Sequence, residues 1–170
     1  MEQRLDLLRP DLTHQEYIHV LQRMYGFYHP LEARLFALHG WSSVGLALEA
    51  RKKVPLLEAD LIHAGMTETT LLSLPICQTL PRVETFAQGL GCLYVVEGAT
   101  LGGQVLTRHF QRQTHTQQWS CSFFRSYRDR TGPMWKEFVE KVTSYATTTA
   151  TEESILSSAM ETFLCLEQWL

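Results

Sequence analysis

Hydrophobic residues recur at three- and four-residue spacing along most of the chain, which is the period of a helix with one buried face. The first such segment begins with a potential capping box at Thr13 and Glu16, and its apolar positions run as far as Leu38. Pro30 is expected to kink or restart this helix. The same periodicity predicts further helices at residues 56–64, 83–112, 132–145 and 152–169.

Two segments between these helices show other patterns. Residues 72–81 contain two prolines and are predicted to form a loop. Residues 119–127 are rich in aromatic side chains, but no second alternating run offers them a strand partner, so we interpret them as an ordered loop packed on the core. No low-complexity linker or internal repeat divides the chain. The sequence therefore predicts one all-α domain, a helical bundle that spans residues 1–170.

The composition and charge of the chain mainly exclude certain classes of protein. Hydrophobic residues make up 45% of the 170 residues and charged residues 19%, which is typical of a globular domain. The net charge of −3 provides no basic surface that would attract nucleic acid. No apolar run approaches the ~20 residues of a membrane-spanning helix, and the first residues lack the apolar core of a signal peptide. We therefore expect a cytoplasmic protein that binds neither nucleic acid nor membrane.

The helix predicted at residues 83–112 contains five glycines within fifteen residues. This is unusual, because each glycine inside a helix costs about 1 kcal/mol relative to alanine. On a helix, Gly91, Val95, Gly98 and Gly102 fall on one line, which we call the glycine stripe, and Gly103 lies beside it. Such a stripe lets either a second helix or a flat ligand come close to the helix backbone. Composition alone favours the second helix, which is the more general use of glycine.

Three separated segments resemble one known family. Residues 94–104, YVVEGATLGGQ, resemble the distal-helix signature of the heme oxygenases, especially the bacterial biliverdin-producing type associated with phytochromes. Residues 25–32, YGFYHPLE, resemble the second helix of that family. Residues 123–127 and 131–135, FFRSY and TGPMW, resemble its later loop–helix joint. The resemblance covers nearly the whole chain, implies a heme-oxygenase-like helical bundle, and shifts the interpretation of the glycine stripe towards a flat ligand.

The resemblance also implies a cofactor and a reaction. In this family, heme is both cofactor and substrate, and it lies between a proximal helix with an axial histidine and the glycine-rich distal helix. By resemblance, the backbone at Gly98 and Gly102 would approach the heme face and serve catalysis, with Ala99, Leu101 and Gly103 beside them in the heme-binding wall. The ring would be opened to biliverdin with release of CO and iron, using O2 and an electron donor. A phytochrome is the biliverdin acceptor that this type of relative suggests.

The axial histidine is the part of the family pattern that the chain does not match. In the register of the resemblance, this histidine is expected about three residues upstream of Met1, so that either the first helix is incomplete here or the chain is a homologue that has lost heme ligation. No metal ligand is therefore assigned within the chain, and His109 is the first of its seven histidines to test as a substitute. Ala99 stands where mammalian-type enzymes carry a carboxylate. Glu97 points about 200° away from Ala99 on a helix, and we interpret it as a packing or salt-bridge residue.

Three hypotheses follow from these observations. The first is a biliverdin-forming heme oxygenase, and the second is a non-catalytic module that binds heme or another tetrapyrrole on the same fold. The third is a helical protein whose glycine stripe serves only helix crossing. An open slot beside the stripe would support either ligand hypothesis. Tight packing of Gly91, Gly98 and Gly102 on a neighbouring helix would support the third.

Overall fold

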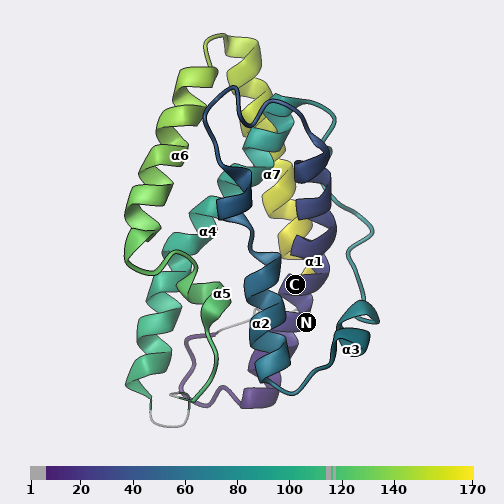
Figure 1. Ribbon diagram of the computed structural model, residues 1–170, viewed down its shortest axis with the longest axis vertical. Coiled ribbons are helices and arrows are strands. Elements are labelled where there is room, and N and C mark those ends of the chain that lie inside the picture. Colours follow the sequence, from purple (N-terminus) through teal and green to yellow (C-terminus); the bar gives the residue numbers. More distant parts are fainter. Residues whose placement is uncertain (1–6, 114–115, 117) are drawn as a thin grey trace.

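The computed structural model describes residues 7–113, 116 and 118–170, and every regular element within these ranges is helical (Figure 1). The prediction of an all-α domain is therefore confirmed. The helices are α1 (His14–Ala37), α2 (Val54–His63), α3 (Glu68–Leu72), α4 (Phe86–Arg112), α5 (Ser122–Arg125), α6 (Thr131–Tyr145) and α7 (Thr149–Trp169). Short 3-10 helices, η1 (Leu48–Arg51) and η3 (Arg128–Arg130), precede α2 and α6.

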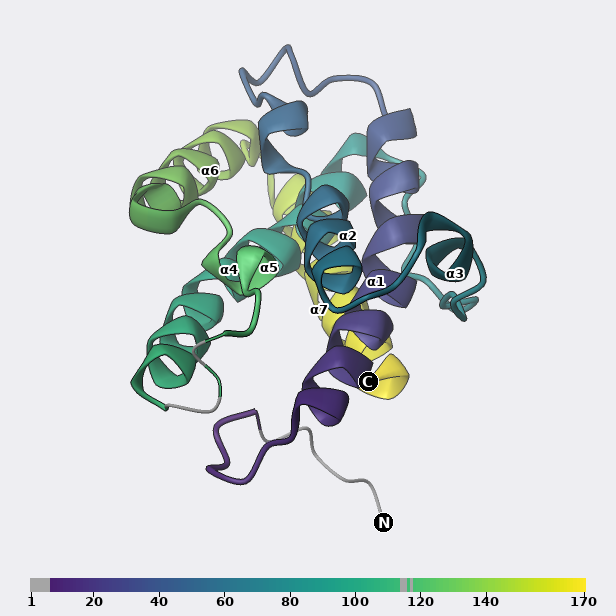
Figure 2. The same ribbon diagram turned by 60° about the horizontal axis from the view of Figure 1, so that its bottom comes forward.

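Helix α4 is the central element of the bundle. It packs against α5, α6 and α7, while α1 packs mainly against α2. Figures 1 and 2 both place α6 and α3 at opposite edges of the molecule, with α2 and α4 between them. The side chains between these helices form one hydrophobic core, whose fully buried members include Phe27, Leu31, Leu57, Leu90 and Phe138. None of the described helices combines the length and the apolarity needed to cross a membrane.

Local side-chain caps explain where the long helices begin. The predicted capping box is present, because the Thr13 hydroxyl accepts a hydrogen bond from the Glu16 amide and the Glu16 carboxylate accepts one from the Thr13 amide. Thr85 and Gln88 make the same exchange at the start of α4, and Thr148 caps α7. The observed bounds of the four long helices lie within three residues of the predicted ones.

Pro30 was expected to kink or restart the first helix, and the structure shows no restart. Proline lacks the amide hydrogen that would bond to the carbonyl four residues earlier, which belongs to Gly26. In this structure the Gly26 carbonyl accepts a hydrogen bond from the Cys77 amide instead, at 2.8 Å. The loop after α3 therefore supplies the missing partner, and α1 runs without interruption from His14 to Ala37.

Residues 119–127 differ from the prediction, because they contain a short helix rather than only loop. Helix α5 occupies four of these residues, and its Phe123 and Phe124 side chains are buried together with Trp119. The expected packing on the core is therefore observed. The helix forms here because its first amides bond to a carboxylate from α2, a distant contact that local sequence patterns do not show.

Candidate functional site

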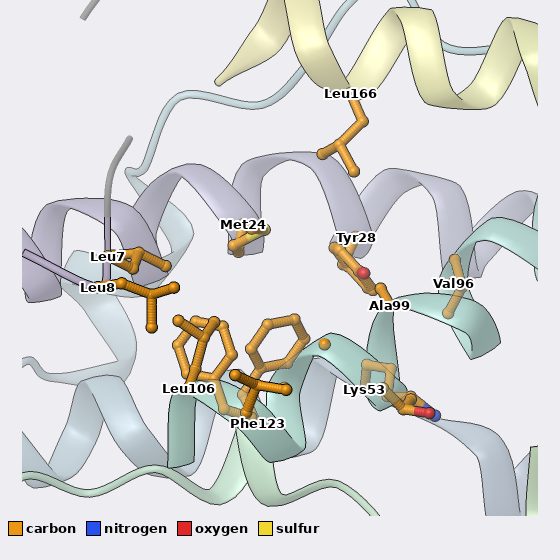
Figure 3. Close-up of a pocket in the computed structure, with 15 residues that line it drawn as sticks. Leu7, Leu8, Met24, Tyr28, Lys53, Val96, Ala99, Leu106, Phe123 and Leu166 are labelled. Atoms are coloured by element: carbon orange, nitrogen blue, oxygen red, sulfur yellow. The ribbon is translucent and has the colours of Figure 1, made fainter. Parts of the chain in front are cut away.

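A cavity of about 460 Å³ lies between α1, α4, α5 and α7 (Figure 3). Its wall is almost entirely apolar. Helix α1 contributes Met24 and Tyr28 from one side, and α4 contributes Ala99 and Gly102 from the other. The aromatic rings of α5 and Leu166 of α7 complete the wall, together with residues 7 and 8. A cavity of this size and polarity is typical of a site for a small, largely hydrophobic ligand.

The structure separates the residues that the sequence had grouped on the distal helix. Ala99, Gly102 and Gly103 line the cavity, whereas Gly98 and Leu101 are not among its lining residues. A Cβ atom built on Gly102 would have no described atom within 4 Å, so the backbone is open to the cavity there. A Cβ atom on Gly98 would lie 3.6 Å from the Trp135 ring of α6. Leu101 is 41% exposed on the outer side of α4.

Gly91 and Gly103 are covered by neighbouring helices. A Cβ atom on Gly91 would overlap the Ile155 carbonyl oxygen and lie 2.8 Å from the Cβ of Ser158, both on α7. A Cβ atom on Gly103 would lie 2.5 Å from the Phe124 carbonyl oxygen, so this glycine allows α5 to approach α4. The glycine stripe therefore does not face a single neighbour. Its first glycine serves helix crossing, and Gly102 leaves an open slot.

Tyr28 is one of the polar cavity residues that the sequence did not single out as functional. Its side chain is only 2% exposed, and Figure 3 shows it on α1 opposite Ala99. Within the described residues, its hydroxyl has no hydrogen-bond partner. Burial, together with the carboxylates of Glu32 and Glu97, raises its pKa well above the ordinary value of a tyrosine. The hydroxyl therefore stays protonated and can donate a hydrogen bond into the cavity.

A buried network of charged side chains lies beside the cavity. Its centre is Glu97, the α4 residue that precedes Gly98. The carboxylate of Glu97 is fully buried and lies 2.5 Å from Nη1 of Arg51 and 3.0 Å from Nζ of Lys53. The hydroxyl of Tyr127 donates a hydrogen bond to the same carboxylate at 2.6 Å. The interpretation of Glu97 as a salt-bridge residue is confirmed.

Lys53 lines the cavity with its carbon chain rather than with its charge. Its ammonium group already donates hydrogen bonds to Glu97, to the hydroxyl of Tyr127 at 2.5 Å and to the carbonyl of Arg51 at 2.9 Å. Desolvation lowers the pKa of Lys53, and the neighbouring Glu97 carboxylate opposes this shift. All three donors of the ammonium are used, so the cavity gains rigidity from Lys53 but no free positive charge.

The described lining residues include no histidine. In the described part of the chain, no group of three histidine, cysteine, aspartate or glutamate residues is arranged to hold a metal ion. His109 does not line the cavity, and its Nε2 lies 2.7 Å from the side-chain amide of Gln113. Met1, on which the register of the expected upstream histidine rests, lies outside the described residues.

The fold and the cavity together define an all-helical domain with an apolar slot against a glycine-bearing central helix. The sequence profile of the heme oxygenase family matches residues 2–170, so the chain belongs to the heme oxygenase family. The resemblance seen in the sequence is thereby confirmed. A crystal structure of NO- and CO-bound heme oxygenase from Neisseria meningitidis has the same fold, with a TM-score of 0.76 and 20% sequence identity. The match covers 95% of this chain and 78% of that chain. No curated protein sequence matches the chain.

Proposed function

We propose that this chain is an enzyme that opens heme to biliverdin with release of CO and iron, using O2 and electrons from an electron donor. The observation that carries the proposal is the open backbone position at Gly102, inside an apolar cavity of about 460 Å³ in a member of the heme oxygenase family. A bare backbone position lets the face of a flat ring come within contact distance, and apolar walls suit a porphyrin.

The cavity residues fit heme in complementary roles. Ala99, Gly102 and Gly103 would orient the ring against the α4 backbone, and the α5 rings would exclude water from its edge. Tyr28 would hold a proton at its hydroxyl oxygen and donate a hydrogen bond to a polar atom or water at the ring face. Bound heme supplies the redox chemistry, and the protein supplies orientation and electrostatics. Gly98 and Leu101 stay in the proposed heme-binding wall by resemblance alone, because neither residue lines the cavity.

The setting of the reaction is also part of the proposal. A cytoplasmic bacterial enzyme with a phytochrome as biliverdin acceptor fits the type of relative that the distal-helix sequence resembles. This part rests on that resemblance alone.

A hemin titration in the presence of imidazole tests the proposal. Imidazole supplies the axial nitrogen that the described lining residues lack. Gly102→Leu fills the open slot, and Gly132→Leu is the matched control, because Gly132 on α6 also has no described atom near its Cβ position and does not line the cavity. We expect the original protein and Gly132→Leu to bind hemin, and Gly102→Leu to lose binding. Adding reductant and O2 should then produce the green spectrum of biliverdin and release CO.

Two results would overturn the proposal: no hemin binding by the original protein with imidazole, or equal binding by Gly102→Leu. A second candidate function is a non-catalytic tetrapyrrole-binding module. It is favoured by Ala99, which places a methyl group rather than a carboxylate on the cavity wall. This module would bind hemin or biliverdin and lose binding in Gly102→Leu, but the bound hemin would stay intact when reductant and O2 are added.

A further inference from the structure

The aromatic wall of the cavity belongs to a helix that is too short to be stable without contacts from other elements. Phe123 and Phe124 line the cavity, and both belong to α5, which has only four residues. A single helical turn is unstable in isolation, because the entropy lost in forming it exceeds what its few hydrogen bonds return. Contacts from other elements must therefore fix the position of these rings.

The carboxylate of Asp60 on α2 provides the contact at the start of α5. Its Oδ1 accepts a hydrogen bond from the Ser122 amide at 2.9 Å, and its Oδ2 accepts one from the Phe123 amide at 2.9 Å. The Ser120 hydroxyl donates a further hydrogen bond to Oδ1 at 2.5 Å. Asp60 is 1% exposed, so these bonds form in a site shielded from water, where charge-assisted hydrogen bonds are strong.

The far end of α5 is held in a less favourable backbone conformation. Ser126, which follows the helix, has a φ of 43°, in the left-handed region that serine rarely adopts. The Arg125 carbonyl accepts a hydrogen bond from the side-chain amide of Gln104 on α4 at 3.1 Å. A strained residue persists only where surrounding contacts hold it. The hydrogen bonds from Asp60 therefore restrain the first turn of α5, together with the packing of its two buried rings and the Gln104 contact at its far end.

We propose that Asp60 is a positioning residue for the ligand of the cavity. By bonding the amide of Phe123, its carboxylate sets where that ring stands relative to the open slot on α4. The nature of the ligand rests on the proposed function, whereas the effect of Asp60 on the α5 wall does not. Removing the carboxylate should leave the bundle folded and let α5 move, so that the cavity no longer matches a rigid, flat ligand.

The test compares Asp60→Ala with two controls. Ser120→Ala removes the hydroxyl that bonds to Asp60 and leaves both α5 amide bonds in place. Leu57→Ala, on the same helix, truncates a fully buried side chain that does not line the cavity, so it lowers stability without touching α5 bonds. Each variant is titrated with hemin plus imidazole and with the apolar dye anilinonaphthalene sulfonate, and amide hydrogen exchange of Phe123 is followed by NMR. All measurements are made below the unfolding transition.

We expect Asp60→Ala to bind hemin about 10-fold or more weakly, a loss of the size seen when hydrogen bonds that orient metal ligands are removed. Its Phe123 amide should exchange faster, and its dye fluorescence should change. Both controls should bind hemin and dye as the original protein does, and Leu57→Ala should raise Phe123 exchange no more than that of other buried amides, as a loss of global stability does. Equal losses in Leu57→Ala and Asp60→Ala would show that Asp60 acts only through global stability, and would overturn the inference.

The measurements distinguish a failure of the role proposed for Asp60 from a failure of the proposed function. If the original protein binds no hemin, the proposed function fails, while Phe123 exchange and dye binding still test Asp60. Unchanged exchange and dye binding in Asp60→Ala would overturn the positioning role. If Asp60→Ala does not fold, Asp60→Asn replaces it, because asparagine keeps one acceptor oxygen; faster Phe123 exchange supports the role, and unchanged exchange refutes it.

Discussion

Gly91 and Gly102 lie on the same stripe of α4, yet replacing each by alanine should change stability in opposite directions. Alanine is favoured over glycine inside a helix by about 0.8–1 kcal/mol. At Gly102 the new methyl group would meet no described atom within 4 Å, so Gly102→Ala should stabilise the fold by about that amount. In a chain of this length, 1 kcal/mol corresponds to a rise in Tm of about 2–4 °C.

At Gly91 the same gain is opposed by overlap with α7. The methyl group would meet the Ile155 carbonyl oxygen, lie 2.8 Å from the Cβ of Ser158 and lie 3.0 Å from the Ala159 amide nitrogen. Two of these three atoms are backbone, so relief requires the whole α4–α7 crossing to open. Overpacking of this kind costs about 1–3 kcal/mol or more. Gly91→Ala should therefore unfold at a lower temperature than the original protein, despite its better helix propensity.

Thermal and urea unfolding, followed by far-ultraviolet circular dichroism, measure both effects. Hemin titration of the same proteins should show weaker binding by Gly102→Ala, because its methyl group projects into the cavity. Gly132→Ala is the control, since it also adds a methyl group in open space but does not line the cavity. A lower Tm for Gly102→Ala, or an unchanged Tm for Gly91→Ala, would refute the division of the stripe into an open part and a covered part.

Three further tests concern the buried carboxylate of Glu97, the buried hydroxyl of Thr107 and the buried hydroxyls of Tyr17 and Tyr28. Glu97→Gln should lower the free energy of unfolding by about 3–5 kcal/mol, because buried Lys53 loses its counter-charge and buried Arg51 keeps only that of Glu137. Glu137→Gln, whose side chain is 48% exposed, should lower it by less than about 1 kcal/mol in the same urea unfolding series. Thr107→Val removes a buried hydroxyl that has no hydrogen-bond partner among the described residues, and should raise the free energy of unfolding by about 1 kcal/mol in thermal unfolding. Burial raises the pKa of Tyr17 and Tyr28 above the value of 10.0 expected for the unfolded chain, so stability present below pH 10 should be lost as the pH rises. The loss should approach about 1.4 kcal/mol per pH unit for each tyrosine, and equal stability at about pH 9 and pH 11 would contradict it.

The sequence predicted the long helices because their determinants are local. Hydrophobic periodicity marks the buried face of each helix, and the Thr13 capping box lies within four consecutive residues. Two of the deviations from the predicted elements have non-local causes. Helix α5 is capped by Asp60, about sixty positions earlier, and the carbonyl left free by Pro30 is bonded by the Cys77 amide. Neither partner is identifiable before the tertiary contacts are known.

The distinction between local and non-local determinants also applies to the candidate site. Glycine spacing was enough to predict that α4 has a bare face, because that is a property of one helix. Which neighbour covers each glycine depends on where α7 and α6 cross α4, and the sequence does not encode that crossing point locally. In the sequence, Tyr28 stood out only as part of residues 25–32, the segment that resembles the second helix of the family. The donor role proposed for it rests on a hydroxyl that has no hydrogen-bond partner among the described residues.

These contacts give the two walls of the cavity different rigidity. On the α4 side, Glu97 binds Arg51 and Lys53 with almost no exposure to solvent, and the residues before it are packed against α7. On the α5 side, the Asp60 carboxylate and the packing of Phe123 and Phe124 hold only four residues, which end at a serine with a positive φ. Local opening is easiest where few buried contacts must break. We therefore expect α4 to act as a fixed surface and α5 as the wall that adjusts to a bound ligand. Ligands of different shape should displace Phe123 and Phe124 more readily than the α4 backbone at Gly102.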